Sequence, residues 1–269
     1  MKIATAGAVV LFSLLTAVPL ASAQTMRLGQ SLVFYVPELR TGVDSKAFET
    51  HVTGQVIPGW NTNIPGTHAT LVRKDRGSHP GQFQLVWTTD TLARRQETAG
   101  SATFPFNVAT TTRAGDFRPG LDRFVAGGRY QEYQLLAPDT VGNLPEVDVL
   151  GLHYIKVKPE QAAAFDRFVA TKLHAAVGNL RPDLRLLYYK PISGDAPGNY
   201  VTVIALTKAS RDKYWPKGQD SDDVKAAFGL AVTALATELQ TYLVPGSWGT
   251  GMAAAVYESK DWADWVLLN

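Results

Sequence analysis

The chain has 269 residues, no cysteine and a formal net charge of +2. The lack of cysteine excludes disulfides, thiolate metal ligands and a cysteine nucleophile. Charges of both signs are interspersed, so no basic stripe or polybasic segment predicts binding of nucleic acid or of an anionic membrane.

The N-terminal segment has the pattern of a secretory signal peptide. A positively charged start is followed by an apolar run to Leu20 and by Ala-Ser-Ala at residues 21–23, and these small residues suit signal peptidase. A membrane anchor is the alternative, but the apolar core is short for a span and Pro19 follows it closely. We therefore expect cleavage of residues 1–23, a secreted or periplasmic protein, and no membrane contact after cleavage.

The first half of the mature chain alternates strand and helix signals. Runs of β-branched and aromatic residues predict strands, and apolar residues at helical spacing predict helices. Asp44 and Ser45 can cap the first helix, and Pro58-Gly59 is expected to end it. The predicted elements are strands at 31–36, 67–73, 83–88 and 130–136, a helix from about 46, and a weaker helix near 120–125.

The second half shows the same order. Pro159 suits the first turn of one helix, and Ser221 caps a longer helix. A glycine-rich stretch, 246–251, follows that helix and precedes a strand, which is the wrong context for phosphate binding, so we predict a mobile loop. The predicted elements are strands at 147–157, 184–190, 200–206, 253–257 and 262–268, and helices from 160 and from 221.

The two halves align without gaps at an offset of 117 residues. Between Ala47 and Arg95, 9 of 49 positions are identical, where average composition gives about 3. The matches fall on the helix core, the turn glycines and the prolines, where the backbone is constrained. Two unrelated units with common turn chemistry are the alternative. We predict a tandem duplication of a ferredoxin-like βαββαβ unit, with repeats at 24–144 and 145–269.

The second half resembles the dimeric α+β barrel superfamily, which includes the antibiotic-biosynthesis-monooxygenase-like, NIPSNAP-like and EthD-like domains. The resemblance rests on the run Gly151-Leu-His-Tyr-Ile-Lys-Val-Lys-Pro-Glu-Gln161 and on the helix with Phe165 and Phe168 that follows. It implies two ferredoxin-like sheets packed into one intrachain α+β barrel with helices outside. A monomer is slightly favoured, because one chain would supply both halves of the barrel.

Two residues are candidates for catalysis. His153 lies in an apolar strand, where the offset places Val36 in the first half, and it could serve as an acid or base. Arg185 corresponds to His68 on the second strand of each half, and an arginine inside the barrel would favour a carboxylate or enolate. The alternatives are a buried structural histidine and a solvent-facing pair.

His68, Trp87, Tyr188 and Tyr189 are candidate ligand-binding residues, with core packing as the alternative for the aromatic ones. The histidines form no zinc-binding motif, so no metal and no cofactor are predicted. His51 and His79 are expected at the surface. His174 is also expected to face solvent, with haem ligation as its alternative role.

No hydrolase, Walker or dinucleotide-binding motif occurs, so the sequence leaves it uncertain whether the protein is an enzyme. The leading hypothesis is a secreted barrel protein that binds a small apolar or aromatic ligand. The alternatives are a cofactor-independent oxygenase or isomerase acting on an enolisable substrate, a haem-binding protein, and a structural module that docks a partner through its sheet edges or its C-terminal tryptophans.

Overall fold

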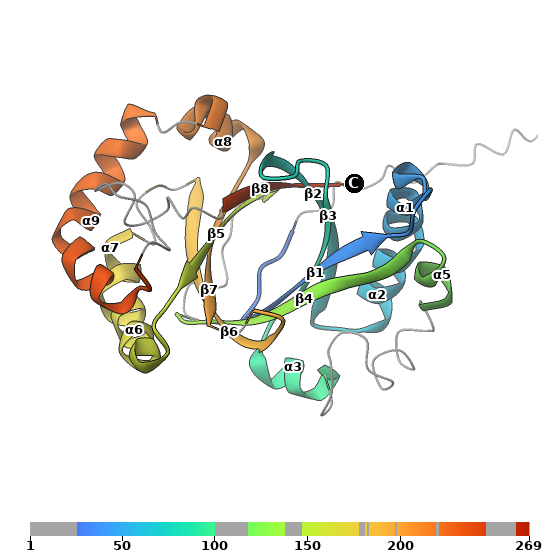
Figure 1. The fold of residues 1–269 in the computed structure, drawn as a ribbon, viewed down its shortest axis with the longest axis horizontal. Coiled ribbons are helices and arrows are strands. Elements are labelled where there is room, and N and C mark those ends of the chain that lie inside the picture. The colour runs from blue at the N-terminus through green and yellow to red at the C-terminus, as the bar shows by residue number, and fades with distance from the viewer. Residues whose placement is uncertain are drawn as a thin grey trace, which may run out of the picture.

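In a computed structural model, eight antiparallel strands close into one barrel, and helices cover two opposite sides of it (Figure 1). The structure describes residues 26–99, 118–137, 147–177, 181, 183–196, 198–218, 221–245 and 262–268. The predicted α+β class and the barrel are therefore confirmed, while the predicted 246–251 loop and the 253–257 strand lie outside the described residues.

The strand order around the barrel is β1-β3-β2-β8-β5-β7-β6-β4. The first half of the chain thus contributes four neighbouring strands and the second half the other four, and two seams, β2–β8 and β4–β6, join the halves. The strands are β1 (Ser31–Leu39), β2 (Thr67–Gly77), β3 (Phe83–Thr89), β4 (Val125–Leu135), β5 (Val149–Lys156), β6 (Leu184–Gly194), β7 (Asn199–Leu206) and β8 (Trp262–Leu267).

The helices α1, α2 and α5 of the first half lie at one side of the barrel, and α6, α7 and α9 of the second half lie at the other (Figure 1). The helices of the first half are α1 (Ser45–His51), the π-helical turn η1 (Val52–Val56), α2 (Ile57–Asn63), α3 (Leu92–Ala99) and α5 (Arg118–Asp122). Those of the second half are η3 (Pro159–Gln161), α6 (Ala162–Phe168), the π-helical turn η4 (Val169–Leu173), α7 (His174–Val177), α8 (Lys208–Tyr214), η5 (Pro216–Gly218) and α9 (Asp222–Tyr242).

Local sequence signals explain where several helices begin. The Asp44 carboxylate accepts the backbone N–H of Lys46 at 2.9 Å, and Ser221 caps α9, as the sequence predicts. The expected stop at Pro58-Gly59 is wrong. The chain passes through the π-helical turn and starts a new α-helix in which Pro58 occupies the first turn, where its missing N–H is not needed. No sequence pattern predicted α3 or α8.

Equivalent elements of the two halves share the 117-residue spacing. It relates Ser45–His51 to Ala162–Phe168, the π-helical turn Val52–Val56 to Val169–Leu173, and Thr67–Gly77 to Leu184–Gly194. Gly81 and Gly198, also 117 apart, adopt positive φ angles of 88° and 85°. Since only glycine adopts such angles without strain, this backbone match explains why glycine stands at both positions.

Three apolar clusters form the core. One lies inside the barrel and contains buried residues from all eight strands, including Phe34, Tyr189 and Trp265. Each of the others packs one half of the barrel against its own helices. Because side chains alternate along a strand, every second residue faces the barrel interior and the residues between them face the helices.

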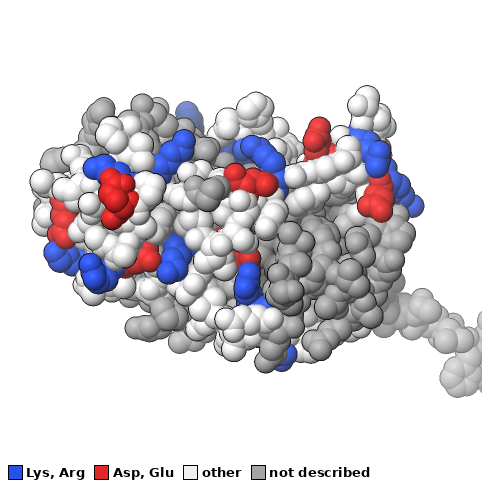
Figure 2. Space-filling model, turned by 60° about the horizontal axis from the view of Figure 1, so that its bottom comes forward, with Lys and Arg blue, Asp and Glu red and all other residues white. Residues whose placement is uncertain are grey.

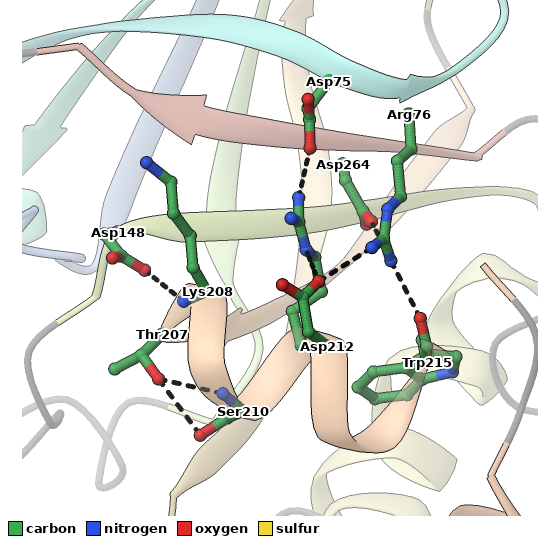
Figure 3. A network of polar contacts seen from close by, with 10 residues as sticks. Asp75, Arg76, Asp148, Thr207, Lys208, Ser210, Asp212, Trp215 and Asp264 are labelled. Carbon is green, nitrogen blue, oxygen red and sulfur yellow. Dashed lines mark hydrogen bonds and ion pairs between the residues drawn. The ribbon is translucent and has the colours of Figure 1, made fainter. Parts of the chain in front are cut away.

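The two seams carry ion pairs on the helix-facing side. At the β2–β8 seam, Arg76 donates to Asp212 at 2.8 Å and to the Trp215 carbonyl at 2.9 Å, and lies 3.8 Å from Asp264 (Figure 3). At the β4–β6 seam, Arg95 of α3 binds both carboxylate oxygens of Glu132, at 2.5 and 2.6 Å. Ser193 of β6 also donates to Glu132, at 2.8 Å, so each network joins a helix and the last strand of one half to the second strand of the other half.

Charges of both signs lie side by side over the face shown in Figure 2. Among the described helices, none is both long and apolar enough to cross a membrane.

Candidate ligand cavity at the barrel mouth

The described residues enclose a cavity of about 560 Å³ at one end of the barrel, a size typical of small-molecule sites. It lies at the end where the hairpins β2–β3 and β6–β7 turn, and we call this end the barrel mouth. Both turns contribute to its rim, with Ser78 and His79 from one hairpin and Asp195 and Ala196 from the other. The cavity is therefore built by both halves of the chain.

Aromatic side chains of the second half form one wall of the cavity, and aromatic side chains of β4 and β1 lie opposite it. Trp265 of β8 is only 3% exposed and points into the barrel. Tyr154 of β5 packs against the same interior cluster, and Tyr133 of β4 packs edge-on against Phe34 with ring centroids 5.6 Å apart. These rings offer flat apolar surface to a ligand.

Cationic groups lie beside this wall. The Lys74 ammonium lies 4.9 Å from the centroid of the Trp265 ring, within the range of a cation–π interaction. Arg129 of β4 lines the cavity as well and is exposed. His79 at the rim is also exposed, as predicted, but adopts a φ of 56°, which is unusual for a residue other than glycine.

Other polar residues of the mouth are fixed by the backbone. The Asp195 carboxylate accepts the N–H of Tyr130 at 2.8 Å. The Gln131 amide donates to the Ser193 carbonyl at 2.6 Å and accepts the N–H of Ala196 at 2.7 Å. These bonds hold the β6–β7 turn against β4 and give the rim a defined shape.

Two buried polar groups on the interior face have no hydrogen-bond partner among the described residues. One is the indole N–H of Trp265, and the other is the side-chain amide of Gln84, whose oxygen and nitrogen both lack partners. Gln84 is 1% exposed and lies two residues from Gln82, which lines the cavity. A buried polar group without a partner costs about 1–3 kcal/mol, so both groups favour a polar ligand atom or water within the barrel.

The opposite end of the barrel is closed by the segment before β1. Met26 and Leu28 belong to the interior cluster. The Arg27 carbonyl accepts from the Thr88 hydroxyl at 2.8 Å, and the Gly29 carbonyl accepts from the Tyr189 hydroxyl at 3.0 Å. Tyr189 therefore lies inside the barrel, as a ligand-binding residue would, but its hydroxyl is bound to the backbone and it does not line the mouth.

Three of the predicted site residues face the helices instead of the barrel interior: His153, Tyr188 and Trp87. Tyr188 packs in the cluster formed with α6 and α9, and Trp87 packs against Trp60 of α2 with ring centroids 5.7 Å apart. Burial lowers the pKa of His153 to about 3, so its imidazole is neutral near pH 7. Burial also raises the pKa of Tyr188.

The register of the strands explains the position of His153. His153 of β5 pairs with Thr202 of β7, and Tyr35 of β1 pairs with Leu85 of β3. Leu85 and Thr202 are 117 residues apart, so His153 corresponds to Tyr35 and not to Val36 as the sequence alignment suggested. A shift of one residue moves a side chain to the other face of a sheet, and Val36, but not His153, lines the cavity.

His68 and Arg185 do lie on the interior face, but at the end of the barrel opposite to the mouth. His68 lies 3.4 Å from the Asp90 carboxylate. The Arg185 guanidinium donates to the backbone carbonyls of Arg181 and Leu184 at 3.2 and 3.0 Å. The structure thus brings His68 and Arg185 to one end, but it places His153 and Arg185 on opposite faces of the sheet.

A second, more open groove of about 710 Å³ runs beside α1. His51 in it is only 9% exposed, so the expected surface position is wrong; Phe124 and the backbone of Gly120 cover the ring. Burial, followed by the charge of Arg123, lowers the pKa of His51. The described residues contain no group of three or more histidine and acidic side chains that could hold a metal.

Sequence reasoning missed the residues that line the mouth, Lys74, Arg129, Gln131 and Trp265 among them. Arg129, Tyr130 and Gln131 are consecutive and all line the cavity, so strict alternation along β4 could not have identified them.

Comparisons with known proteins identify the fold. A proposed monooxygenase from Fusobacterium nucleatum superposes with a TM-score of 0.51 at 12% identity, over 91% of this chain and 94% of that one. A proposed monooxygenase from Lactobacillus acidophilus gives 0.47 at 11% identity, over 88% and 93%. No protein-family model and no curated protein matches the sequence. At 12% identity the likeness to the first of these structures shows the fold alone, which is the α+β barrel described above.

Proposed function

We propose that the protein binds a small molecule in the barrel mouth. The observation that carries this proposal is the cavity of about 560 Å³ beside Trp265, whose buried indole N–H has no partner among the described residues. A ligand atom that accepts this N–H would remove the penalty of an unmade hydrogen bond. The aromatic wall would supply apolar contact area.

A thermal-unfolding screen tests this function. Small aromatic and apolar compounds, with and without acidic groups, should include some that raise the melting temperature of the wild type. A ligand present at 100 times its dissociation constant stabilises by about 2.7 kcal/mol. The same compounds should have little effect on the variants Trp265→Phe and Gln131→Ala, and no shift with any compound would overturn the proposal.

An enzymatic role as a cofactor-independent oxygenase or isomerase is a second candidate, favoured by the likeness in fold to a proposed monooxygenase. The acid–base role of His153 and the anion-binding role of Arg185 remain predictions, although the two side chains face opposite sides of the sheet. Turnover that is unchanged in a His153→Ala variant would remove the first of these roles. Haem binding also remains a prediction, and neither His153 nor His174 lines the mouth. A flat Soret region after haem titration would exclude it.

We also propose that the chain arose by duplication of a βαββαβ unit, with repeats at 24–144 and 145–269. The shared π-helical turns, the shared positive-φ glycines and the 117-residue spacing of helices and strands support it. A closed barrel within one chain further supports a monomer. Sedimentation at micromolar concentration would test the monomer, and N-terminal sequencing of the exported protein would test cleavage after Ala23 and a secreted or periplasmic location.

A further inference from the structure

The two halves contribute different chemistry to equivalent positions around the mouth. Lys74 and His79 of the first half correspond, at the offset of 117, to Pro191 and Ala196 of the second. The strand pairings also match Gln131 with Ala263 and Tyr133 with Trp265, since both pairs occupy the same register positions on the last strand of each half. The first half therefore supplies cationic and polar groups, and the second half supplies the indole and two alanines.

The charges of the mouth favour an anion. Lys74 and Arg129 are the lysine and the arginine among the described lining residues, and Asp195 is the acidic residue among them. The Asp195 carboxylate accepts the Tyr130 N–H, so one of its oxygens is already engaged by the backbone. In a partly enclosed cavity, where solvent screens less, two cations against one anion attract a negatively charged ligand.

The arrangement of Lys74 and Trp265 indicates how an anionic ligand would be oriented in the cavity. The ammonium lies 4.9 Å from the centroid of the indole ring, and the indole N–H of the same ring is buried without a partner among the described residues. Lys74 and Trp265 are direct neighbours where β2 pairs with β8, so both groups belong to the same part of the cavity. A planar ring attached to a carboxylate held there would lie against the aromatic wall that includes Tyr154, where ring stacking adds to the burial of apolar surface.

We propose that the ligand of the barrel mouth is an aromatic carboxylate, with its anionic end at Lys74 and the Trp265 N–H and its ring along the wall contributed by the second half. This inference rests on the proposed function and deepens it, because it names the chemical class of the ligand and its orientation.

Calorimetric titration with naphthalene-2-carboxylate and with its neutral isostere naphthalene-2-carboxamide tests the proposal. The carboxylate should bind the wild type at least ten-fold more tightly than the amide, a difference of about 1.4 kcal/mol or more. Its affinity should also fall with added salt, while that of the amide should not. Equal affinity for the two compounds would overturn the proposal.

Variants of residues that line the barrel mouth test whether the preference for the carboxylate arises there. Lys74→Met should weaken carboxylate binding about ten-fold and leave amide binding unchanged, and Lys74→Arg should restore most of the affinity. Arg129→Met should act in the same direction with a smaller effect, because Arg129 is exposed. Lys225→Met is the matched control, since Lys225 lies on α9 with a side chain 58% exposed. All variants are first compared with the wild type by circular dichroism and melting temperature.

The outcomes separate this proposal from the one on which it rests. If neutral compounds bind as tightly as carboxylates and Trp265→Phe abolishes the binding, the ligand class is wrong and the mouth still binds small molecules. If no compound binds in a Trp265-dependent way, both proposals are overturned. An undiminished affinity in Lys74→Met, with the variant folded, contradicts the orientation.

Discussion

The two seams that join the halves of the barrel have an acidic residue at the same position. Glu132 of β4 and Asp264 of β8 both lie opposite equivalent residues of the first strand of their half, Val33 and Gly151. They differ in burial and in pairing. The Glu132 side chain is 1% exposed and is bound at both oxygens by Arg95, whereas the Asp264 side chain is 14% exposed and lies 3.8 Å from Arg76.

This difference shows how equivalent backbone positions can support unequal interactions. At the β4–β6 seam, one acid and one arginine form a closed pair, and Ser193 donates a further hydrogen bond to Glu132 at 2.8 Å. At the β2–β8 seam, the charge is shared among several residues, and burial is the main cause that raises the pKa of Asp264. We infer that the β4–β6 seam depends on one pair and that the β2–β8 seam tolerates the loss of one member.

The largest predicted effect is that of Glu132→Ala. This change leaves the partly buried Arg95 guanidinium without its carboxylate, and breaking a buried pair in this way typically costs about 3–5 kcal/mol. Asp264→Ala should cost less, because Arg76 keeps its bond to Asp212. Urea unfolding of both variants measures the difference. Equal losses would mean that the seams do not differ energetically.

The next largest loss of stability is predicted for Gly194→Ala, at the β4–β6 seam. Its φ is 121°, and an added Cβ would lie 2.5 Å from the Tyr130 carbonyl oxygen, so Gly194→Ala combines backbone strain with a steric clash. Gly198→Ala is the control, because its φ is 85° and nothing lies within 4 Å of the added Cβ. Strain alone costs about 1–3 kcal/mol. The melting temperature should fall further for Gly194→Ala, and the reverse order would contradict the tight packing of this seam.

His153 should make the free energy of unfolding depend on pH. Its counterpart in the first half is Tyr35, so only the second half carries a histidine at this position. Burial lowers the pKa of His153 to about 3, so the unfolded chain binds a proton below about pH 6.5 while the folded chain does not. The free energy of unfolding is therefore not reduced by His153 above pH 6.5, and it falls as the pH decreases from 6.5 toward 3. The loss reaches about 2 kcal/mol at pH 5.

A His153→Gln variant should show a smaller loss of stability between pH 7 and pH 5 than the wild type, measured by urea unfolding at each pH. Identical pH dependence in the two proteins would show that His153 becomes protonated in the folded state.

The smallest effect is predicted for Asp212→Ala at the β2–β8 seam. The Asp212 side chain is 58% exposed, and both of its partners have other contacts, Arg76 with the Trp215 carbonyl and Arg211 with Asp75. An exposed ion pair contributes about 0–1 kcal/mol. The midpoint of urea unfolding should therefore change little, and a loss above 2 kcal/mol would mean that this seam is as dependent on one residue as the other.

Sequence patterns predicted the strands and their order, because β-branched runs and turn glycines are local signals. They did not predict which face of β5 points into the barrel. A shift of one residue in register exchanges the two faces, and the register is set only by the pairing of β5 with β7. The 117-residue offset therefore matched His153 with Val36, whereas the strand register matches it with Tyr35. The mouth itself is formed by residues such as Lys74 and Trp265, which lie nearly 200 positions apart and meet only when the β2–β8 seam closes.

The most direct test of binding in the barrel mouth is the indole N–H resonance of Trp265 in a nitrogen-15 spectrum, assigned with the Trp265→Phe variant. On titration with naphthalene-2-carboxylate, we predict a downfield shift of this proton that saturates with the calorimetric affinity, because the buried N–H gains an acceptor. The indole protons of Trp60 and Trp87, on the helix-facing side, should move little. A Trp265 resonance that stays in place while the compound binds would contradict the account.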